Sequence, residues 1–260
     1  MANPSDAVIV VTSCSLDGWN RYGAKGVATL LQYWPPEVHV HLVSEDVLPL
    51  DAMRQLACEQ GRLMFWDLGL HERATGFYEQ HRKNNTAKGH MHTHYDFRKD
   101  AWRFSKKVFA IEMVARYTAG GRLIWLDADT VTLSPVPMEM LQRMPPNEFS
   151  LAFLDRSRKY HSECGFVGYN LNRDDTRNFI ATFADLYVSG EVFKLKEWHD
   201  SWVFDWVRHH TRIAGYGIPH NNNSHPFVHS ELGKYMDHLK GARKTLGISV
   251  DHPRFKRAKG

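Results

Sequence analysis

Short apolar runs recur along the chain, and stretches with helical spacing separate them. The runs are rich in valine, isoleucine, leucine and aromatic residues, a pattern typical of strands buried on both faces. They comprise residues 7–12, 38–43, 63–66, 123–126, 150–154 and 166–169. We expect the first four runs to form a mainly parallel sheet and the last two to add later strands.

Two helices are predicted between these runs. Their apolar positions are Phe104, Val108, Ile111 and Ala115 for the first, and Phe179, Phe183, Leu186 and Tyr187 for the second. Glycines at 120–121 end the first pattern, and Gly190 ends the second. Asp174 or Asp175 is expected to cap the second helix. Strands that alternate with helices predict an α/β fold, here a single Rossmann-like domain with a mostly parallel central sheet flanked by helices.

Composition narrows the classes of protein to consider. Hydrophobic residues make up 43% of the 260 residues and charged residues 24%, which is typical of a globular protein. No repeat, low-complexity block or linker divides the chain, so one domain over residues 1–260 is the simplest organisation. The net charge of +4 suits an anionic ligand, and it is too small to indicate nucleic-acid binding.

Cysteine usage and the N-terminal residues bear on the compartment. Cys14, Cys58 and Cys164 are widely spaced and odd in number, which favours neither a disulfide framework nor a zinc knuckle. The apolar run near the N-terminus is too short for a membrane anchor and follows no basic region. We therefore expect a cytoplasmic protein without an integral membrane segment, which can still lie at the inner face of a membrane.

Two aspartates follow directly after one predicted strand. The sequence LIWLDADTVTLSPV places Asp127 and Asp129 one residue apart behind residues 123–126. Two like charges this close are costly unless a cation or solvent lies between them. Because ligands bind at the carboxyl ends of parallel strands, the pair is placed to hold Mg²⁺ or Mn²⁺ beside phosphate oxygens. The alternative is that Asp127-Ala128-Asp129 only turns the chain.

A second element near the C-terminus carries matching chemistry. His238, Gly241 and Lys244 lie at His-x-x-Gly-x-x-Lys spacing in HLKGARK. Imidazole is a good ligand for divalent transition metals, glycine lets the backbone approach phosphate, and lysine supplies a positive charge. The alternative is a solvated basic segment, since further lysine and arginine residues surround the histidine.

Together, the two elements resemble a known family. The acidic stretch resembles the Asp-x-Asp motif of GT-A fold glycosyltransferases, which use nucleotide-sugar donors. The second element is similar to that of the glycogenin-like and galactosyltransferase-like retaining families, although Thr245-Leu246 replace the Pro-Trp that usually follows. The resemblance implies that Asp127, Asp129 and His238 bind Mn²⁺ or Mg²⁺ and that Lys244 holds the diphosphate.

The resemblance also implies roles for other residues. The full set of implied donor contacts is Thr12, Ser13, Asp46, Arg103, Lys107, Asp127, Ala128, Gly241 and Lys244. Of these, Thr12, Ser13 and Asp46 are candidates for the base or ribose, with strand-end capping as the alternative. Arg103 and Lys107 lie at i,i+4 and repel each other unless an anion bridges them. A solvated helix face is the alternative for that pair.

Glu163 and Asp200 are expected to lie near the donor sugar. If the reaction inverts the anomeric configuration, one of them must be the catalytic base. Asp200 can instead serve only as a helix cap. Trp198 is the preferred candidate for stacking on a sugar ring, whereas Trp202 and Trp206 are expected in the core.

Two segments remain open. Residues 81–100 lack periodicity and are expected to form a long polar loop, whose length suits a lid or an acceptor-binding flap. His90, His92 and His94 alternate within it, so a metal site there is the alternative. The basic tail, 251–260, is expected to be frayed and solvated, with contact to anionic lipid or a charged acceptor as the alternative.

The favoured function is therefore a metal-dependent glycosyltransferase that retains the anomeric configuration. Its donor would be a UDP- or GDP-sugar, and its acceptor a glycan, a protein or a lipid-linked sugar. Residues 1–130 would bind the nucleotide, and residues 131–250 would close the metal and acceptor site. One alternative is a sugar nucleotidyltransferase, although the first strand lacks the Gly-rich loop expected after it. The other is a non-catalytic module that binds carbohydrate or polyanion.

Overall fold

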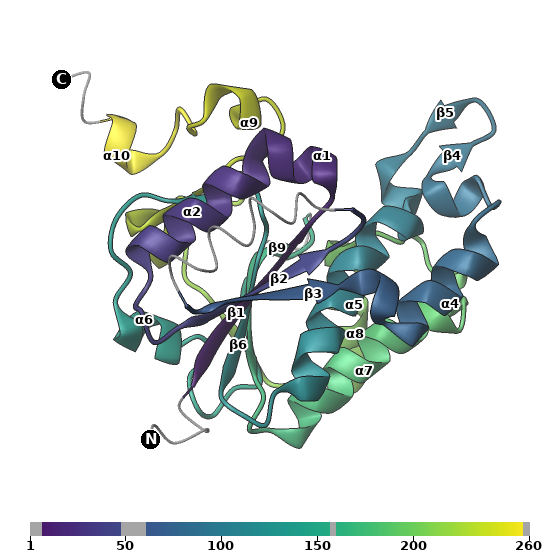
Figure 1. Cartoon of the computed structure of the whole chain (residues 1–260), viewed down its shortest axis with the longest axis horizontal. Coiled ribbons are helices and arrows are strands. Elements are labelled where there is room, and N and C mark those ends of the chain that lie inside the picture. The colour runs from purple at the N-terminus through teal and green to yellow at the C-terminus, as the bar shows by residue number, and fades with distance from the viewer. Residues whose placement is uncertain (1–6, 48–60, 157–159, 257–260) are drawn as a thin grey trace.

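A seven-stranded sheet forms the centre of the molecule (Figure 1). The computed structural model describes residues 7–47, 61–156 and 160–256. The strands follow the order β10-β8-β9-β6-β1-β2-β3. Their bounds are β1 Val8–Cys14, β2 His39–Ser44, β3 Leu63–Asp67, β6 Arg122–Leu126, β8 Leu151–Leu154, β9 Glu163–Asn170 and β10 Gly215–Gly217. Neighbouring strands are parallel except at β9, which runs antiparallel to both β6 and β8.

Each predicted strand is present, and the expected α/β fold with a mostly parallel sheet is confirmed. The main difference lies in β9, which begins at Glu163 rather than Phe166. Glu163, which lies outside the predicted run, is therefore the first residue of a buried strand. β10 is a further short strand that no apolar run in the sequence predicts.

Helices cover both faces of the sheet (Figure 1). One face carries α1 Leu16–Gly18, the π-helical turn Trp19–Gly23, α2 Ala24–Tyr33, α6 Met138–Gln142, α9 Arg243–Leu246 and α10 Pro253–Lys256. The other carries α4 Glu72–His81, α5 Ala101–Tyr117, α7 Asp174–Val188 and α8 Asp200–Thr211. None of the helices within the described residues is both long and apolar enough to span a membrane.

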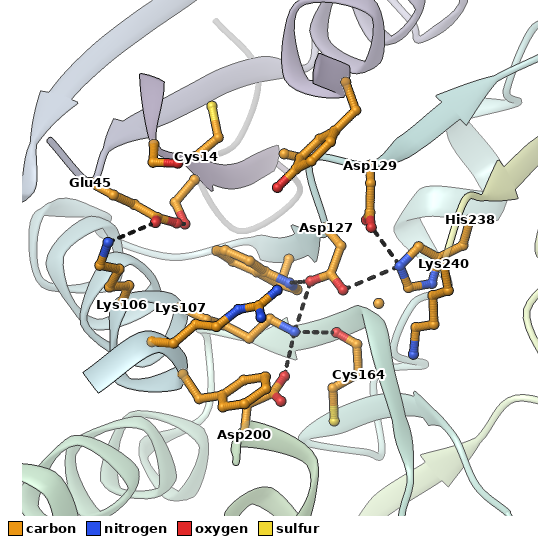
Figure 2. A pocket seen from close by; sticks show the side chains of 18 of the residues that line it. Cys14, Glu45, Lys106, Lys107, Asp127, Asp129, Cys164, Asp200, His238 and Lys240 are labelled. Carbon is orange, nitrogen blue, oxygen red and sulfur yellow. Dashed lines mark hydrogen bonds and ion pairs between the residues drawn. The ribbon is translucent and has the colours of Figure 1, made fainter. Parts of the chain in front are cut away.

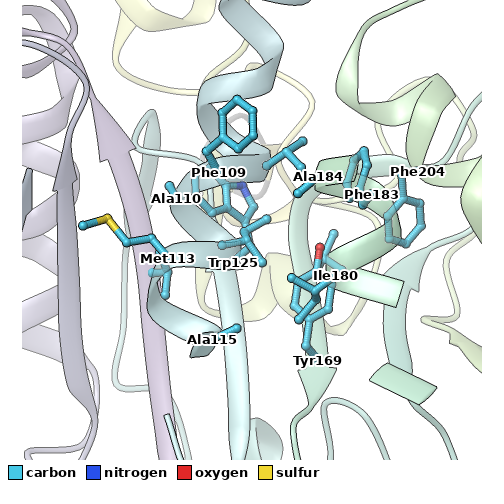
Figure 3. Close-up of a cluster of buried hydrophobic side chains, with 14 of the residues drawn as sticks. Phe109, Ala110, Met113, Ala115, Trp125, Tyr169, Ile180, Phe183, Ala184 and Phe204 are labelled. Atoms are coloured by element: carbon cyan, nitrogen blue, oxygen red, sulfur yellow. The ribbon is translucent and has the colours of Figure 1, made fainter. Parts of the chain in front are cut away.

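Alternation along the central strands creates two cores. Successive side chains of a strand point to opposite faces. Ile9 of β1 and Trp125 of β6 therefore pack beneath α5, α7 and α8, whereas Val10 and Ile124 pack beneath α2 and α6. Figure 3 shows the first core, in which Trp125 lies among Phe109 and other buried side chains. Both faces being covered explains why these strands are apolar without interruption.

The two predicted helices are present as α5 and α7, but the predicted cap of α7 is wrong. Arg173 occupies the N-cap position, and Asp174 and Asp175 lie in the first turn. The Asp175 carboxylate instead accepts hydrogen bonds from Ser150 Oγ at 2.8 Å and from Arg173 Nε at 3.1 Å. The acidic residue thus ties the start of the helix to the segment before β8.

The His-rich segment is more ordered than expected. Within it, β4 (His90–Met91) and β5 (His94–Tyr95) form an antiparallel hairpin that projects from the body of the molecule (Figure 1). His92 lies at its turn with a φ of 39°. The three alternating imidazoles therefore do not share one face of one strand, and the alternative of a metal site built on such a face is wrong.

The beginning of the basic tail is packed onto the fold. His252 is buried, with Nε2 lying 3.2 Å from the carbonyl oxygen of Met236, and Arg254 donates to the carbonyl of Leu133 at 2.6 Å. The expectation of a frayed tail is therefore wrong for residues 251–255, and residues 257–260 lie outside the described part of the chain. Cys58, one of the three cysteines, also lies outside it.

Helix α2 supports the turn that carries the two aspartates. β7 (Thr130–Thr132) follows that turn, and its Thr132 backbone N–H donates to Thr29 Oγ1 of α2 at 3.0 Å. A Cβ at Gly26 would lie far inside van der Waals contact of the Ala128 carbonyl oxygen. Only glycine therefore allows the helix to approach this closely.

Replacement of Gly26 by alanine should destabilise the protein. The added methyl group has no space, so we expect Gly26→Ala to lower the free energy of unfolding by about 1–3 kcal/mol in urea denaturation. Gly76→Ala in α4 is the matched control, because a Cβ there meets nothing within 4 Å. That change should be neutral or stabilise by up to about 1 kcal/mol. Equal stability of the two variants would show that the close approach is unimportant.

Candidate functional site

A cleft of about 900 Å³ opens at the carboxyl ends of β1 and β6 (Figure 2). It gathers most of the residues predicted from the sequence. These are Ser13, Arg103, Lys107, Asp127, Ala128, Asp129, Glu163, Asp200, His238, Gly241 and Lys244. Three further predicted residues, Thr12, Asp46 and Trp198, do not line it.

The turn after β6 and a short antiparallel ladder bring three metal-binding groups together. β11 (Met236–His238) pairs with β7, with His238 opposite Thr130, and Leu239 N–H donates to the Asp129 carbonyl at 3.0 Å. Trp125 Nε1 donates to Asp127 Oδ1 at 2.7 Å and orients that carboxylate. Residues more than a hundred positions apart in sequence therefore face one another as a result of strand pairing.

The carboxylates of Asp127 and Asp129 both approach one buried nitrogen, Nε2 of His238. His238 Nε2 lies 3.3 Å from Asp127 Oδ2 and 3.1 Å from Asp129 Oδ1. Despite these short distances, Nε2 is buried and makes no hydrogen bond of acceptable angle to any described residue. One nitrogen and two carboxylate oxygens aimed at a common point suit a divalent cation, and their donor types fit Mn²⁺ or Mg²⁺.

Close packing of β9 fixes the histidine ring. A Cβ at position 165 would collide with the imidazole of His238, so Gly165 leaves the space that the ring occupies. His238 Nδ1, on the other edge of the ring, lies 3.4 Å from Glu163 Oε1. Burial opposes a charge on this ring, but Asp129, Asp127 and Glu163 outweigh it and raise the pKa of His238 well above its ordinary value.

Lysine side chains neutralise the acids of the cleft. Figure 2 shows Lys107 reaching from α5 toward Asp127, at 2.8 Å, and Asp200, at 2.6 Å. Burial opposes the lysine charge, but the two carboxylates raise the pKa of Lys107 well above its usual range. On the other side, Lys244 lies 2.8 Å from Asp129. The lysines expected to meet phosphate therefore already lie against the two aspartates.

Glu163 and Lys240 form a further buried contact. Lys240 Nζ donates to Glu163 Oε2 at 2.6 Å. Burial would raise the pKa of Glu163, but Lys240 and His238 lower it well below the ordinary value. Glu163 is therefore an anion that supports the histidine from behind, a position that the sequence did not indicate.

Glu45 lies at the end of the cleft opposite His238 (Figure 2). Its Oε1 accepts a hydrogen bond from the Ser13 hydroxyl at 2.8 Å, and its Oε2 lies 3.2 Å from Lys106 Nζ. Arg103 also faces this cleft, and no carboxylate of the described residues lies within 4.0 Å of its guanidinium. Among the described cations that line the cleft, Arg103 can therefore meet a ligand anion without giving up an ion pair.

Thr12, Asp46 and Trp198 lie outside the cleft, whereas Asp200 lines it. Thr12 is buried within β1, and the Asp46 carboxylate accepts a hydrogen bond from Leu16 N–H at 2.7 Å, which corresponds to the capping alternative. Asp200 begins α8, but His199 provides the N-cap, so the alternative that Asp200 only caps the helix is wrong. Trp198 is 6% exposed and its Nε1 donates to Leu195, so it offers no ring face to the cleft.

Sequence reasoning missed several residues that line the cleft: Asp17, Arg21, Tyr22, Glu45, Lys106 and Lys240. Lys240 lay inside the quoted HLKGARK element, two positions after the histidine, and that spacing could have placed it on the same side of an extended chain. Glu45 directly follows β2, whose carboxyl end lies beside that of β1. The end of the second apolar run was therefore a usable signal.

Comparisons with known proteins test the fold. No protein-family model matches the sequence, and no curated protein is similar to it in sequence. Among solved structures, the glycosyltransferase GlyE of Streptococcus pneumoniae TIGR4 is 12% identical with a TM-score of 0.54, over 82% of this chain and 45% of that one. The bifunctional glycosyltransferase WbbM is 11% identical with a TM-score of 0.54, over 98% and 51%.

An active-site mutant of LgtC is a third similar structure, at 12% identity and a TM-score of 0.52, over 81% of this chain and 72% of that one. The chain spans about half the length of GlyE and WbbM. At such low identity, these likenesses establish architecture alone. The chain has the fold that these glycosyltransferases share.

Proposed function

We propose that the protein is a metal-dependent glycosyltransferase that moves a sugar from a nucleotide diphosphate donor to an acceptor hydroxyl with retention of configuration. One observation carries the proposal. Asp127, Asp129 and the buried Nε2 of His238 converge within a cleft that also holds Arg103, Lys107 and Lys244. The fold shared with glycosyltransferases supports it.

Asp127, Asp129 and His238 would hold the cation. When bound, a divalent ion stabilises the negative charge that develops on the departing diphosphate. The buried nitrogen supports this assignment, because an oxygen of each aspartate lies within 3.3 Å of it and it makes no well-formed hydrogen bond to a described residue. Glu163 would orient the imidazole through Nδ1, as carboxylates commonly do for metal-binding histidines.

The cleft has the size and charge that a nucleotide-sugar needs. Its volume of about 900 Å³ falls in the range of small-molecule sites. Lys244 and Lys107 would contribute positive charge beside the diphosphate, and Arg103 can pair with an oxyanion directly. Gly241, with a φ of 58°, allows the backbone to turn at the cleft wall beside these groups.

The pairing of the acids favours retention. Each carboxylate that lines the described cleft lies against a cationic group: Asp17 with Arg21, Glu45 with Lys106, Asp127 with Lys107, Asp129 with Lys244, Glu163 with Lys240 and Asp200 with Lys107. Burial would raise the pKa of Asp127, Asp129 and Glu163, but the neighbouring lysines and the His238 ring lower it, so these three are poor proton acceptors. The Asp200 carboxylate lies 2.6 Å from the Lys107 ammonium. The acceptor proton would therefore pass to the departing phosphate, and Asp200 would position Lys107 rather than act as a base.

The substrates follow as part of the proposal. The donor is a UDP- or GDP-sugar, and the acceptor is a glycan, a protein or a lipid-linked sugar. Glu45 would lie near the nucleoside, because it lines the end of the cleft away from the metal ligands (Figure 2). Ser13, whose hydroxyl donates to Glu45, would lie there too.

Nucleotide and metal should stabilise the protein only together. We expect UDP or GDP with Mn²⁺ to raise the melting temperature by several degrees, because a ligand that binds the folded state shifts unfolding by mass action. Asp129→Ala should abolish the shift. Asp174→Ala, which changes an exposed aspartate in the first turn of α7, is the control and should respond like the unaltered protein. Melting curves that never respond would instead support a non-catalytic binding module.

Turnover should require the same aspartate. A screen of nucleotide-sugars with Mn²⁺ present should find a donor that the protein hydrolyses, and Asp129→Ala should slow the reaction by about 100-fold or more through loss of the ion. Proton NMR of the sugar released or transferred should show the anomeric configuration of the donor. An inverted product would contradict the retaining mechanism. Pyrophosphate-dependent cleavage of the nucleotide-sugar to a nucleoside triphosphate and a sugar 1-phosphate would identify a nucleotidyltransferase.

A further inference from the structure

A second cavity, of about 570 Å³, lies against α8 and the segments before β9 and after β8. Its lining includes Trp202, Trp206 and Tyr160, together with charged side chains such as Asp155 and Arg156. The metal and diphosphate chemistry proposed above uses none of these residues. We refer to this cavity as the aromatic groove.

The two tryptophans are arranged to present flat apolar surface. They lie one turn apart on α8, so both side chains project from the same side of the helix. They pack against the core from its edge and remain partly exposed, unlike the buried Trp198. His210 stacks on Trp206 with ring centroids 3.6 Å apart, which holds the indole in place. Tyr160 is 48% exposed, and Arg156 lies 4.5 Å above its ring.

A hydrogen-bonded chain stiffens the wall beside Trp202. His199 Nδ1 accepts from the Trp202 backbone N–H at 3.4 Å, so the ring carries its proton on Nε2, which donates to Glu197 Oε2 at 2.9 Å. The ring of His161 lies 5.3 Å from that of His199 and 6.4 Å from that of Trp202. His161, Glu197 and His199 also lie close enough to one another to hold a metal ion, and the first of them lines the groove.

The aromatic groove and the cleft are built on the same two chain segments. Glu163, Cys164 and Gly165 line the cleft, while Tyr160 and His161, just before them, line the groove. Likewise, Asp200 and Ser201 line the cleft, and Trp202 begins the groove wall on the next residue of α8. Ser162 fixes the two segments to each other through Asp205, with hydrogen bonds of 2.9 and 2.6 Å. A ligand in the groove would therefore lie beside the acids of the cleft.

We propose that the aromatic groove binds sugar rings of an extended oligosaccharide acceptor, which rests on the proposed function of the cleft. Pyranose rings present C–H faces that pack on indole and phenol rings, and their hydroxyls bond to charged groups at the edge. Asp155 is exposed, and its carboxylate makes no ion pair with a described residue, so it is available to such hydroxyls. The groove and the cleft are separate cavities on the same two chain segments, so an acceptor that occupies both is a chain of several sugars.

Direct binding tests this inference without relying on catalysis. Labelled protein would be applied, without nucleotide or metal, to an array of immobilised neutral and anionic oligosaccharides, and the strongest ligand would then be titrated calorimetrically. We expect binding to a neutral oligosaccharide, with Trp206→Ala weakening it about tenfold through loss of stacking. Longer chains of the same sugar should bind more tightly than the monosaccharide.

The matched control is Trp66→Ala. Trp66 is also partly buried at the edge of the same core, but it belongs to β3, at the end of the sheet opposite β8 and β10. This variant should bind the oligosaccharide like the unaltered protein, and circular dichroism would confirm that both variants fold. Equal losses in the two variants would attribute the effect to stability and overturn the inference.

Other results are distinguishable. A blank array, or salt-sensitive binding of anionic glycans alone that Trp206→Ala leaves intact, would overturn the stacking role of the groove. Saccharide binding that depends on Trp206, in a protein that neither binds nor hydrolyses a nucleotide-sugar, would support the groove and reject the proposed function. Nucleotide-dependent stabilisation without saccharide binding would support the proposed function and overturn the role of the groove.

Discussion

Charge compensation at the carboxyl ends of β1 and β6 is the constraint on which the site depends. Asp127 and Asp129 are held on a tight turn, where their mutual repulsion would be costly without nearby positive charge. Lys107, Lys244 and the protonated ring of His238 supply that charge from three separate elements. Lys107 and His238 each meet a second acid, and Lys244 lies over the ring of Tyr22, so the arrangement is a network rather than a set of pairs.

The same network explains how binding and catalysis would be linked. A bound cation and a diphosphate carry opposite charges, and together they can replace the internal partners that the acids and lysines now have. The lysines would turn from carboxylates to phosphate oxygens, while the carboxylates and imidazole turn to the ion. Binding of either component alone would leave part of the network unpaired, which disfavours metal without nucleotide and nucleotide without metal.

Periodicity and local motifs were sufficient to predict most of the fold and the centre of the site. Continuous apolar runs identified the strands, and the Asp-x-Asp and His-x-x-Gly-x-x-Lys spacings located Asp127, Asp129, His238 and Lys244. What failed depended on tertiary packing. Trp198 is a residue type that can stack on a sugar ring, but neighbouring elements cover it. The pairing of Lys240 with Glu163 joins residues 77 positions apart, and no local sequence pattern reports such a contact.

The ladder between β7 and β11 has a consequence for insertions and deletions. Side chains on a strand alternate between faces, so a shift of one residue in this ladder would exchange the imidazole for a neighbouring side chain. Asp237, which is bonded to Ser249 on the other face, would then confront two aspartates. The loops before and after β11 can absorb changes in their own length. A register shift within this three-residue strand would instead place a third carboxylate where the imidazole now lies.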